Sequence, residues 1–292
     1  MKNFIFISLF TILSTTFVCA TNHYSRDSSW TYGGNGGVNL SQISLSNWAA
    51  GGENAVGFDL LLNYSADYKQ NKHLWQNRFE MAYGLNRTES DGTKKTNDKL
   101  YFSSTYGYEI TKSLYLSALL NFNTQLAKGY DYKTDPRTYI SRFMSPGYLT
   151  TGLGLTWNPK AWVTATFSAI SWRGTFVDSR ILSDEGAFGV DPGDHLFSEM
   201  GGNLKVEMKY EFLKNMTIYS RVDLFSNYLD SPQNVDVRWD VQLNMTVNKW
   251  FSANITTNMI YDNDTKIQQK DGSKGPRLQF KESLGIGFQV SF

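Results

Sequence analysis

Residues 235–247 read VDVRWDVQLNMTV, and apolar residues alternate with polar or charged ones along the whole segment. Val235 and Trp239 belong to the apolar set, whereas Asp236 and Arg238 belong to the polar one. Successive side chains of a β-strand point to opposite faces, so this alternation predicts a strand with one apolar and one wet face. The same alternation recurs along the chain, for example at 54–68, 73–88, 197–213 and 278–292.

The repeated alternation predicts an all-β protein of about twelve strands. Their expected ranges are 38–48, 54–68, 73–88, 97–110, 114–127, 147–157, 161–174, 197–213, 216–229, 233–247, 251–262 and 278–292. The first range is irregular, because Val38 and Leu40 lie on one phase and Ile43 and Leu45 on the other. This change of phase indicates a β-bulge or a segment folded into the interior.

Alternating strands fit either a soluble β-sandwich or a membrane β-barrel, and the length of the strands favours the barrel. Many alternate over more than the roughly 5–6 residues of a globular strand and match the roughly 9–11 residues of a tilted membrane span. The connections at 69–72, 111–113, 158–160, 214–215 and 248–250 are tight, whereas those at 89–96, 128–146, 175–196 and 263–277 are long, although 49–53 and 230–232 are short. Short periplasmic turns and longer outer loops are typical of outer-membrane barrels.

An even number of strands places both ends of the barrel on the periplasmic side, as the order of the connections also requires. Because no water satisfies an open strand edge in hydrocarbon, the first and last strands must pair. We therefore expect a closed antiparallel transmembrane β-barrel of about 12 strands in a bacterial outer membrane. The aromatic residues that flank tight turns would form its periplasmic girdle: Trp75, Trp157, Trp162, Trp250 and Phe251.

Composition narrows the possible functions. Only 19% of the 292 residues are charged, with 28 Lys and Arg against 27 Asp and Glu. The low charge argues against disorder and against a coiled coil, and the balance leaves no basic excess for binding nucleic acid. After the N-terminal segment, no apolar run reaches the roughly 18 residues that a membrane-spanning helix needs.

The first twenty residues have the pattern of a secretory signal peptide. Lys2 precedes an apolar run from Phe4 to Val18, and small residues at Val18-Cys19-Ala20 predict cleavage after Ala20. An uncleaved anchor and lipidation of Cys19 are the alternatives. The expected divisions are a signal peptide at 1–20, an N-terminal periplasmic segment at 21–37 and the barrel at 38–292. Cys19 is the only cysteine, so cleavage leaves no disulfide, cysteine zinc site or thiol nucleophile.

The segment LSNWAAGGEN at 45–54, after GGNGG at 33–37, resembles a family of uncharacterised outer-membrane proteins from Bacteroidota-type bacteria. That family carries only a domain-of-unknown-function label, and the resemblance runs from about Trp30 to Phe292. It implies an outer-membrane β-barrel with no established activity. The residues that carry it are Asn47, Trp48, Gly51, Gly52, Glu53 and Asn54. They form either a tight outer hairpin turn or a short helical turn in the lumen that plugs it or contacts a ligand.

Charged residues on the polar phase are the candidate lining of the lumen. They are Arg78, Glu80, Lys205, Glu207, Lys209, Glu211, Arg221, Asp223, Asp236, Arg238 and Asp240, with Asp59, Asp67, Lys99 and Glu109 on the same phase. In a pore such charges line a water column and set selectivity. In a sealed barrel the same charges pair across the interior and fill it. A barrel of about twelve strands lies between the size that side chains fill and the size that leaves an open channel, so the strand number does not distinguish a pore from a sealed barrel.

Enzymatic and metal sites are the weaker alternatives. His195 has Asp194 beside it and Ser198 nearby, as a surface hydrolase would need. Asp184, Glu185, Asp191 and Asp194 share one loop and could bind calcium. We expect neither, because adjacency in sequence is not geometry and acidic residues in solvated loops usually bind nothing. No enzymatic activity, cofactor or metal site is predicted.

The sequence favours a passive channel or small-solute transporter with a mixed-charge lumen. The alternative is a non-conducting structural or accessory barrel of an outer-membrane complex. The expected partners are outer-membrane lipid and a membrane or periplasmic protein, but no nucleic acid. Each tight turn carries a lysine that could attract anionic headgroups or such a protein, or could merely reflect the polarity of turns: Lys72, Lys112, Lys160, Lys214 and Lys249.

Overall fold

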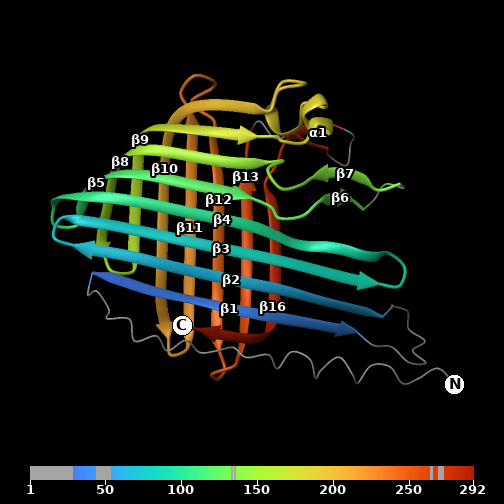
Figure 1. Cartoon of the computed structure of the whole chain (residues 1–292), viewed down its shortest axis with the longest axis horizontal. Coiled ribbons are helices and arrows are strands. Elements are labelled where there is room, and N and C mark those ends of the chain that lie inside the picture. Colours follow the sequence, from blue (N-terminus) through green and yellow to red (C-terminus); the bar gives the residue numbers. More distant parts are fainter. Residues whose placement is uncertain (1–28, 44–53, 133, 135, 264–265, 269–272) are drawn as a thin grey trace.

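The computed structural model describes the whole chain except residues 1–28, 44–53, 133, 135, 264–265 and 269–272. Twelve antiparallel strands close into one barrel in the order β1-β16-β13-β12-β11-β10-β9-β8-β5-β4-β3-β2 (Figure 1). The expected fold class and strand number are confirmed. Among the described residues, no helix has the length and apolar character needed to cross a membrane.

The barrel strands are long, from 11 residues in β5 to 20 in β4. Their bounds are β1 Trp30–Ile43, β2 Ala55–Gln70, β3 His73–Thr88, β4 Gly92–Thr111, β5 Leu114–Thr124, β8 Gly147–Lys160, β9 Val163–Phe176, β10 Leu196–Leu213, β11 Met216–Asn227, β12 Val235–Thr246, β13 Phe251–Tyr261 and β16 Gln279–Ser291. Outside the barrel lie the hairpins β6 Gly129–Asp131 with β7 Thr138–Ser141, and β14 Lys266–Gln268 with β15 Lys274–Pro276, and the short helices α1 Arg180–Asp184 and η1 Ala187–Gly189.

Tight turns gather at one end of the barrel, the turn end, and most of the long connections lie at the other, the loop end. Five tight turns lie at the turn end, where β1 starts and β16 finishes (Figure 1). Asn71, Ser113 and Asn215 adopt positive φ angles of 52°, 69° and 68° in three of these turns. The predicted loop at 89–96 is shorter than expected, because β3 and β4 extend to Thr88 and Gly92 and leave only three residues between them.

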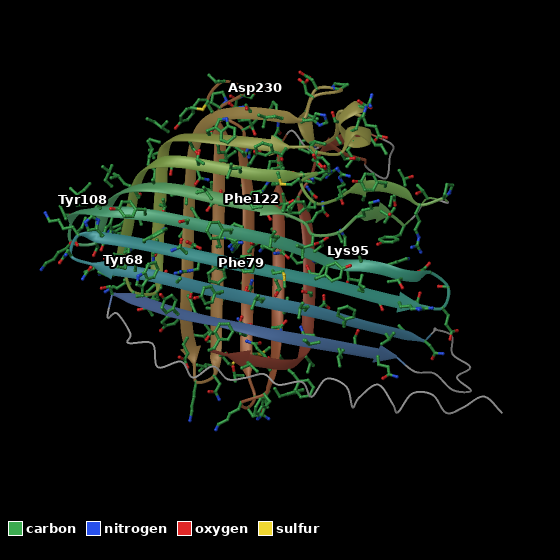
Figure 2. All side chains as sticks on the ribbon, in the orientation of Figure 1. Tyr68, Phe79, Lys95, Tyr108, Phe122 and Asp230 are labelled. Carbon is green, nitrogen blue, oxygen red and sulfur yellow. The ribbon has the colours of Figure 1, made fainter. Side chains whose placement is uncertain are left out.

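The wall has the polarity of a barrel in lipid, with polar side chains inside and apolar ones outside. Among the described residues, the buried side chains include 23 polar or charged residues and only nine apolar ones. On the outer surface, large apolar residues such as Leu153 and Leu284 are more than half exposed, and Phe167 is half exposed. Aromatic side chains project from the wall at Tyr68 and Tyr108 near the turn end and at Phe79 and Phe122 near mid-wall (Figure 2).

The first strand differs from its expected range. It begins at Trp30 rather than Val38, so residues 30–37 of the expected periplasmic segment belong to the barrel. Within its described residues β1 pairs with β2 without a register shift, so the bulge expected there is absent. The glycine-rich start hid the strand, because Gly33, Gly34, Gly36 and Gly37 have no side chains with which to show alternation.

Strands β1 and β16 close the barrel through a short seam. Gly34 and Phe292 exchange two backbone hydrogen bonds of 2.9 and 3.0 Å, and pairing continues to Asn39 opposite Gly287. Glycine is required at this approach, since a Cβ on Gly287 would lie 2.2 Å from the carbonyl oxygen of Val38. The last strand therefore ends on the first, as closure in a membrane requires.

Candidate functional site in the barrel interior

Four charged side chains meet near the middle of the interior, and we call them the crossbar: Glu80, Lys99, Arg221 and Asp240. Arg221 Nη1 donates to Glu80 Oε1 at 2.5 Å, and Arg221 Nη2 donates to Asp240 Oδ2. Lys99 Nζ donates to Glu80 Oε2 at 2.8 Å and to Asp240 Oδ2 at 3.0 Å. Each cation thus contacts both carboxylates, and the four charges sum to zero.

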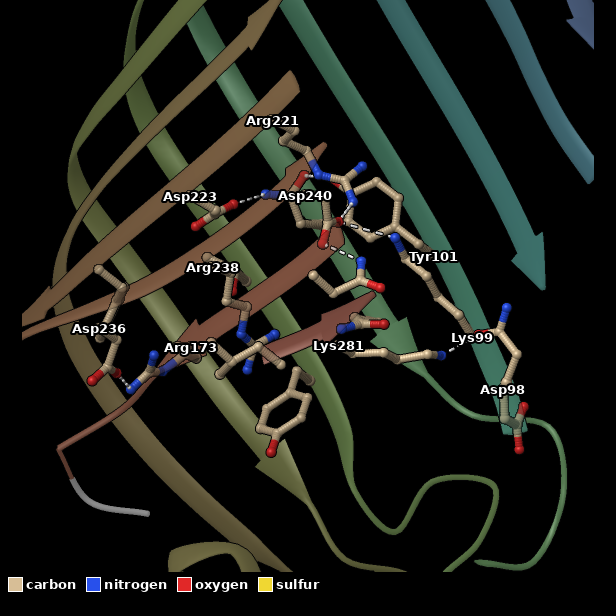
Figure 3. Close-up of a pocket in the computed structure, with 18 residues that line it drawn as sticks. Asp98, Lys99, Tyr101, Arg173, Arg221, Asp223, Asp236, Arg238, Asp240 and Lys281 are labelled. Atoms are coloured by element: carbon tan, nitrogen blue, oxygen red, sulfur yellow. Dashed lines mark hydrogen bonds and ion pairs between the residues drawn. The ribbon is translucent and has the colours of Figure 1, made fainter. Parts of the chain in front are cut away.

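The crossbar joins opposite walls of the barrel. Glu80 and Lys99 come from the neighbouring strands β3 and β4, whereas Arg221 and Asp240 come from β11 and β12. In the twelve-strand ring, β3 lies six places from β11, and β4 six places from β12. The ion pairs Lys99–Asp240 and Arg221–Glu80 join diametrically opposed strands and therefore span the interior. Figure 3 shows the first of them.

Two cavities lie on either side of the crossbar along the barrel axis. The loop-side chamber has a volume of about 260 Å³ and is lined on β12 and β13 by Asp236, Arg238 and Ile260. The turn-side chamber has a volume of about 60 Å³ and is lined on the same strands by Gln242 and Asn254. Lys99 lines both chambers, so the crossbar is their common boundary.

Three arginines in the interior each lie over an aromatic ring. The Cζ atom of Arg221 is 3.8 Å from the ring centroid of Tyr101, and that of Arg173 is 4.0 Å from the centroid of Phe225. Arg238 is 4.3 Å from the centroid of Tyr148. Guanidinium groups stack favourably on aromatic faces, so each ring fixes the height and tilt of its arginine.

The acidic partners of these arginines differ. Arg221 has two carboxylates in the crossbar, and Arg173 donates to both oxygens of Glu199 at 2.6 Å and to Asp236 at 2.6 Å. Arg238 forms no ion pair with any described residue, although Asp223 is its direct neighbour on β11. Asp223 instead accepts hydrogen bonds from the amide of Asn203 at 2.7 Å and from that of Asn121 at 3.4 Å.

Most of the predicted lining residues lie in the interior. Besides those already described, Arg78 pairs with Asp67 at 2.5 Å, and Lys205 Nζ lies 3.3 Å from Glu207 and donates to Ser103 at 2.8 Å. Lys209 and Glu211 are different, since both are exposed where β10 approaches its turn. The alternation continues to the end of the strand, beyond the enclosed interior, so these two residues lie near the turn-end rim of the barrel.

The motif of the resemblance falls largely outside the described residues: Asn47, Trp48, Gly51, Gly52 and Glu53. Its last residue, Asn54, is described and donates to Glu89 Oε1 at 3.0 Å, which links the start of β2 to the end of β3. The choice between an outer turn and a lumen segment therefore stays open. The predicted signal peptide at 1–20 also lies outside the described residues.

Sequence reasoning missed Arg173, Glu199 and Lys281 of the interior. Glu199 and Lys281 lie on the inward phase of their strands and could have been found from it. Arg173 follows a register shift in β9, where Leu153 pairs with Ile170 but Gly154 pairs with Ser168. That bulge changes the inward phase, and its only trace in the sequence is the three-residue spacing between Phe167 and Ile170.

The alternative sites do not assemble in the described part of the chain. His195 Nδ1 is 2.6 Å from the carbonyl oxygen of Val177, and no hydrogen bond joins the described His195 to Ser198 or Asp194. No group of three or more His, Cys, Asp or Glu among the described residues could hold a metal ion. The absence of enzymatic activity stays a prediction.

Two parts of the chain match families of unknown function. Residues 40–130 match a family described as "Protein of unknown function (DUF3078)", and residues 188–274 match one described as "Protein of unknown function, DUF481". The first range contains the motif at 45–54, so the resemblance to a family without an assigned function is supported. No curated protein matches the sequence.

In overall fold the chain is similar to solved outer-membrane barrels. An outer membrane channel from Pseudomonas putida F1 is 10% identical, with a TM-score of 0.38 over 90% of this chain and 96% of that one. The translocator domain of the autotransporter NalP from Neisseria meningitidis is 8% identical, with a TM-score of 0.37 over 90% and 88%. The NanC porin is 9% identical, with a TM-score of 0.37 over 88% and 99%.

Proposed function

We propose that this protein spans a bacterial outer membrane and lets small polar solutes pass through a narrow passage of mixed charge. The single observation that carries the proposal is the pair of polar chambers stacked along the barrel axis, with Lys99 in the lining of both. A barrel whose interior only had to be filled would need no chamber of about 260 Å³. The passage has no cofactor and performs no chemical reaction.

The crossbar makes the proposed passage narrow. Solutes moving from one chamber to the other must pass Glu80 and Arg221, whose side chains meet across the interior. Because the crossbar carries two charges of each sign, it favours neither cations nor anions strongly. The protein then conducts far less than a wide general porin.

A second candidate is a non-conducting accessory barrel, and the crossbar also favours it. All four of its charges find opposite charges within the barrel, so the arrangement is complete without a solute. The lysines of the tight turns, such as Lys72 and Lys214, would then face headgroups or a periplasmic protein partner.

Conductance across planar bilayers tests the proposal. Wild-type protein should give small discrete currents, and Glu80→Gln with Arg221→Gln should raise the unit conductance about two-fold or more, because one of the two ion pairs across the interior is lost. The matched control is Lys209→Gln with Glu211→Gln, which also removes one charge of each sign but at exposed positions, and it should conduct like wild type. If neither wild type nor the crossbar variant gives currents, the passage is rejected and the accessory barrel is favoured.

A further inference from the structure

The loop-side chamber contains one arginine that has an aromatic platform but no carboxylate. Arg173 and Arg221 each lie on a ring and each bind two carboxylates. Arg238 lies on the ring of Tyr148 in the same way, yet it forms no ion pair with a described residue. A guanidinium group presents its donors in a fixed fork that matches a carboxylate, and a cation without a partner in a confined space is costly.

The neighbour that could neutralise Arg238 is held elsewhere. Asp223 faces Arg238 across β11 and β12, as Asp240 faces Arg221 on the same two strands. Arg221 and Asp240 bond to each other, whereas Asp223 accepts from the amides of Asn203 and Asn121. The same register thus gives an ion pair at one level and leaves an arginine without one at the next level toward the loops.

The remaining charges of the chamber favour an anion. Among the lining cations, Lys99, Arg173 and Arg221 have carboxylate partners. Within the described part of the chain, Arg238 has no carboxylate partner, and Lys281 Nζ donates to the amide oxygen of Asn97 at 2.7 Å without forming an ion pair. Among the lining acids, Asp98 pairs with Lys95, Asp236 with Arg173, and Asp240 with the crossbar. Two cations and one carboxylate, Asp223, therefore have no ion pair with another residue that the structure describes.

We propose that the loop-side chamber binds a small organic anion, whose carboxylate forms an ion pair with Arg238 as Glu199 and Asp236 do with Arg173. Figure 3 shows Arg238 among the residues that line the chamber, with Asp223 and Arg173 nearby. The volume of about 260 Å³ suits a solute of about the size of one sugar acid. This inference names the solute class of the passage proposed above and takes its biological meaning from that function, although binding itself needs no conduction.

Isothermal titration calorimetry of the full-length mature protein, refolded in detergent at low salt, tests the inference with sodium glucuronate and, as a neutral solute of similar size, glucose. Wild type should bind glucuronate and not glucose. Arg238→Gln should weaken glucuronate binding about ten-fold or more, and Arg238→Lys should weaken it less because the charge remains. The matched control is Arg87→Gln, an exposed arginine outside the chamber lining, which should bind like wild type.

Asp223→Asn tests whether Asp223 itself takes part in the anion site or only competes with the anion for Arg238. If Asp223 only competes for Arg238, its neutral variant binds glucuronate as tightly as wild type or more tightly. Equal binding of glucuronate and glucose by wild type, undiminished binding by Arg238→Gln, or weaker binding by Asp223→Asn would each overturn the proposed site. Should Arg238→Gln fail to refold, Tyr148→Leu removes the platform instead and should weaken binding. Conduction without glucuronate binding would reject the anion site but not the passage. Glucuronate binding without conduction would reject the passage but not the anion site.

Discussion

Glu80 on β3 and Arg221 on β11 meet across the full width of the barrel, with 2.5 Å between Oε1 and Nη1. Both side chains are nearly inaccessible to solvent, at 9% and 5% exposure. The two residues are 141 positions apart in the chain, and their contact links their strands through the interior as well as around the wall. The pair narrows any passage and, because both charges are buried, the loss of either partner leaves the other charge uncompensated.

Breaking the crossbar at one residue should destabilise the protein. Glu80→Gln leaves Arg221 and Lys99 with one carboxylate between them, and loss of one partner from a buried pair costs about 3–5 kcal/mol. Glu80→Gln with Arg221→Gln should cost less than the sum of the single changes by about 1–3 kcal/mol, because the two residues are in contact. Urea unfolding in lipid vesicles, followed by tryptophan fluorescence, measures both. Strict additivity would show that the pair does not form.

Charge changes in the loop-side chamber should alter ion selectivity in opposite directions. Arg238→Gln removes a cation that has no ion-pair partner among the described residues, so the permeability ratio of chloride to potassium should fall, by about two-fold. Asp240→Asn leaves the crossbar with an excess positive charge, so the ratio should rise. Reversal potentials in a potassium chloride gradient measure the ratio. An unchanged potential in both variants would place these residues outside the conduction path.

The outer surface should tolerate charge according to depth. Leu153 near the middle of β8 and Leu213 beside a tight turn are almost equally exposed, at 59% and 57%. Leu153→Arg should cost about 2–4 kcal/mol and Leu213→Arg about 0–1 kcal/mol, because the bilayer centre penalises charge most. Unfolding free energies in vesicles give the comparison. Equal costs would contradict the outward apolar face as a lipid contact.

Closure of the barrel should depend on glycine at the seam. A Cβ on Gly287 would meet the carbonyl oxygen of Val38 at 2.2 Å, whereas a Cβ on Gly33 would meet nothing nearer than Ser65 Oγ at 3.6 Å. Gly287→Ala should therefore destabilise the barrel by about 1–3 kcal/mol through overpacking, and Gly33→Ala should be close to neutral. The temperature at which the folded band is lost in unheated gel samples reports the difference. Similar temperatures for the two variants would argue against a tight seam.

Cleavage of the predicted signal peptide should remove the only cysteine. Cys19 precedes the expected cleavage site after Ala20, so mature protein purified from outer membranes should not react with a maleimide dye. A Ser46→Cys variant supplies the positive control for labelling after denaturation. Intact mass spectrometry should place the new N-terminus at Thr21. Labelling of the denatured wild-type protein would show that the segment is retained.

The alternation in the sequence predicted much of the fold because strand geometry is local. The polar and apolar faces of β12 can be assigned from Val235 to Thr246 alone, since successive side chains always point to opposite sides. Glycine removes this signal, so the start of β1 was missed. A bulge reverses it, so Arg173 was missed although its neighbour Asp236 was found.

Local pattern thus determined the class of protein, the number of strands, and most of the residues that face inward. It could not determine which inward charges meet, because Glu80 and Arg221 come together only when distant strands close into one ring. It also gave the same description to Arg221 and Arg238, each with an acidic neighbour on the next strand. Only packing of the interior distinguishes them, since the amides of Asn121 and Asn203 come from other strands and donate to the carboxylate of Asp223.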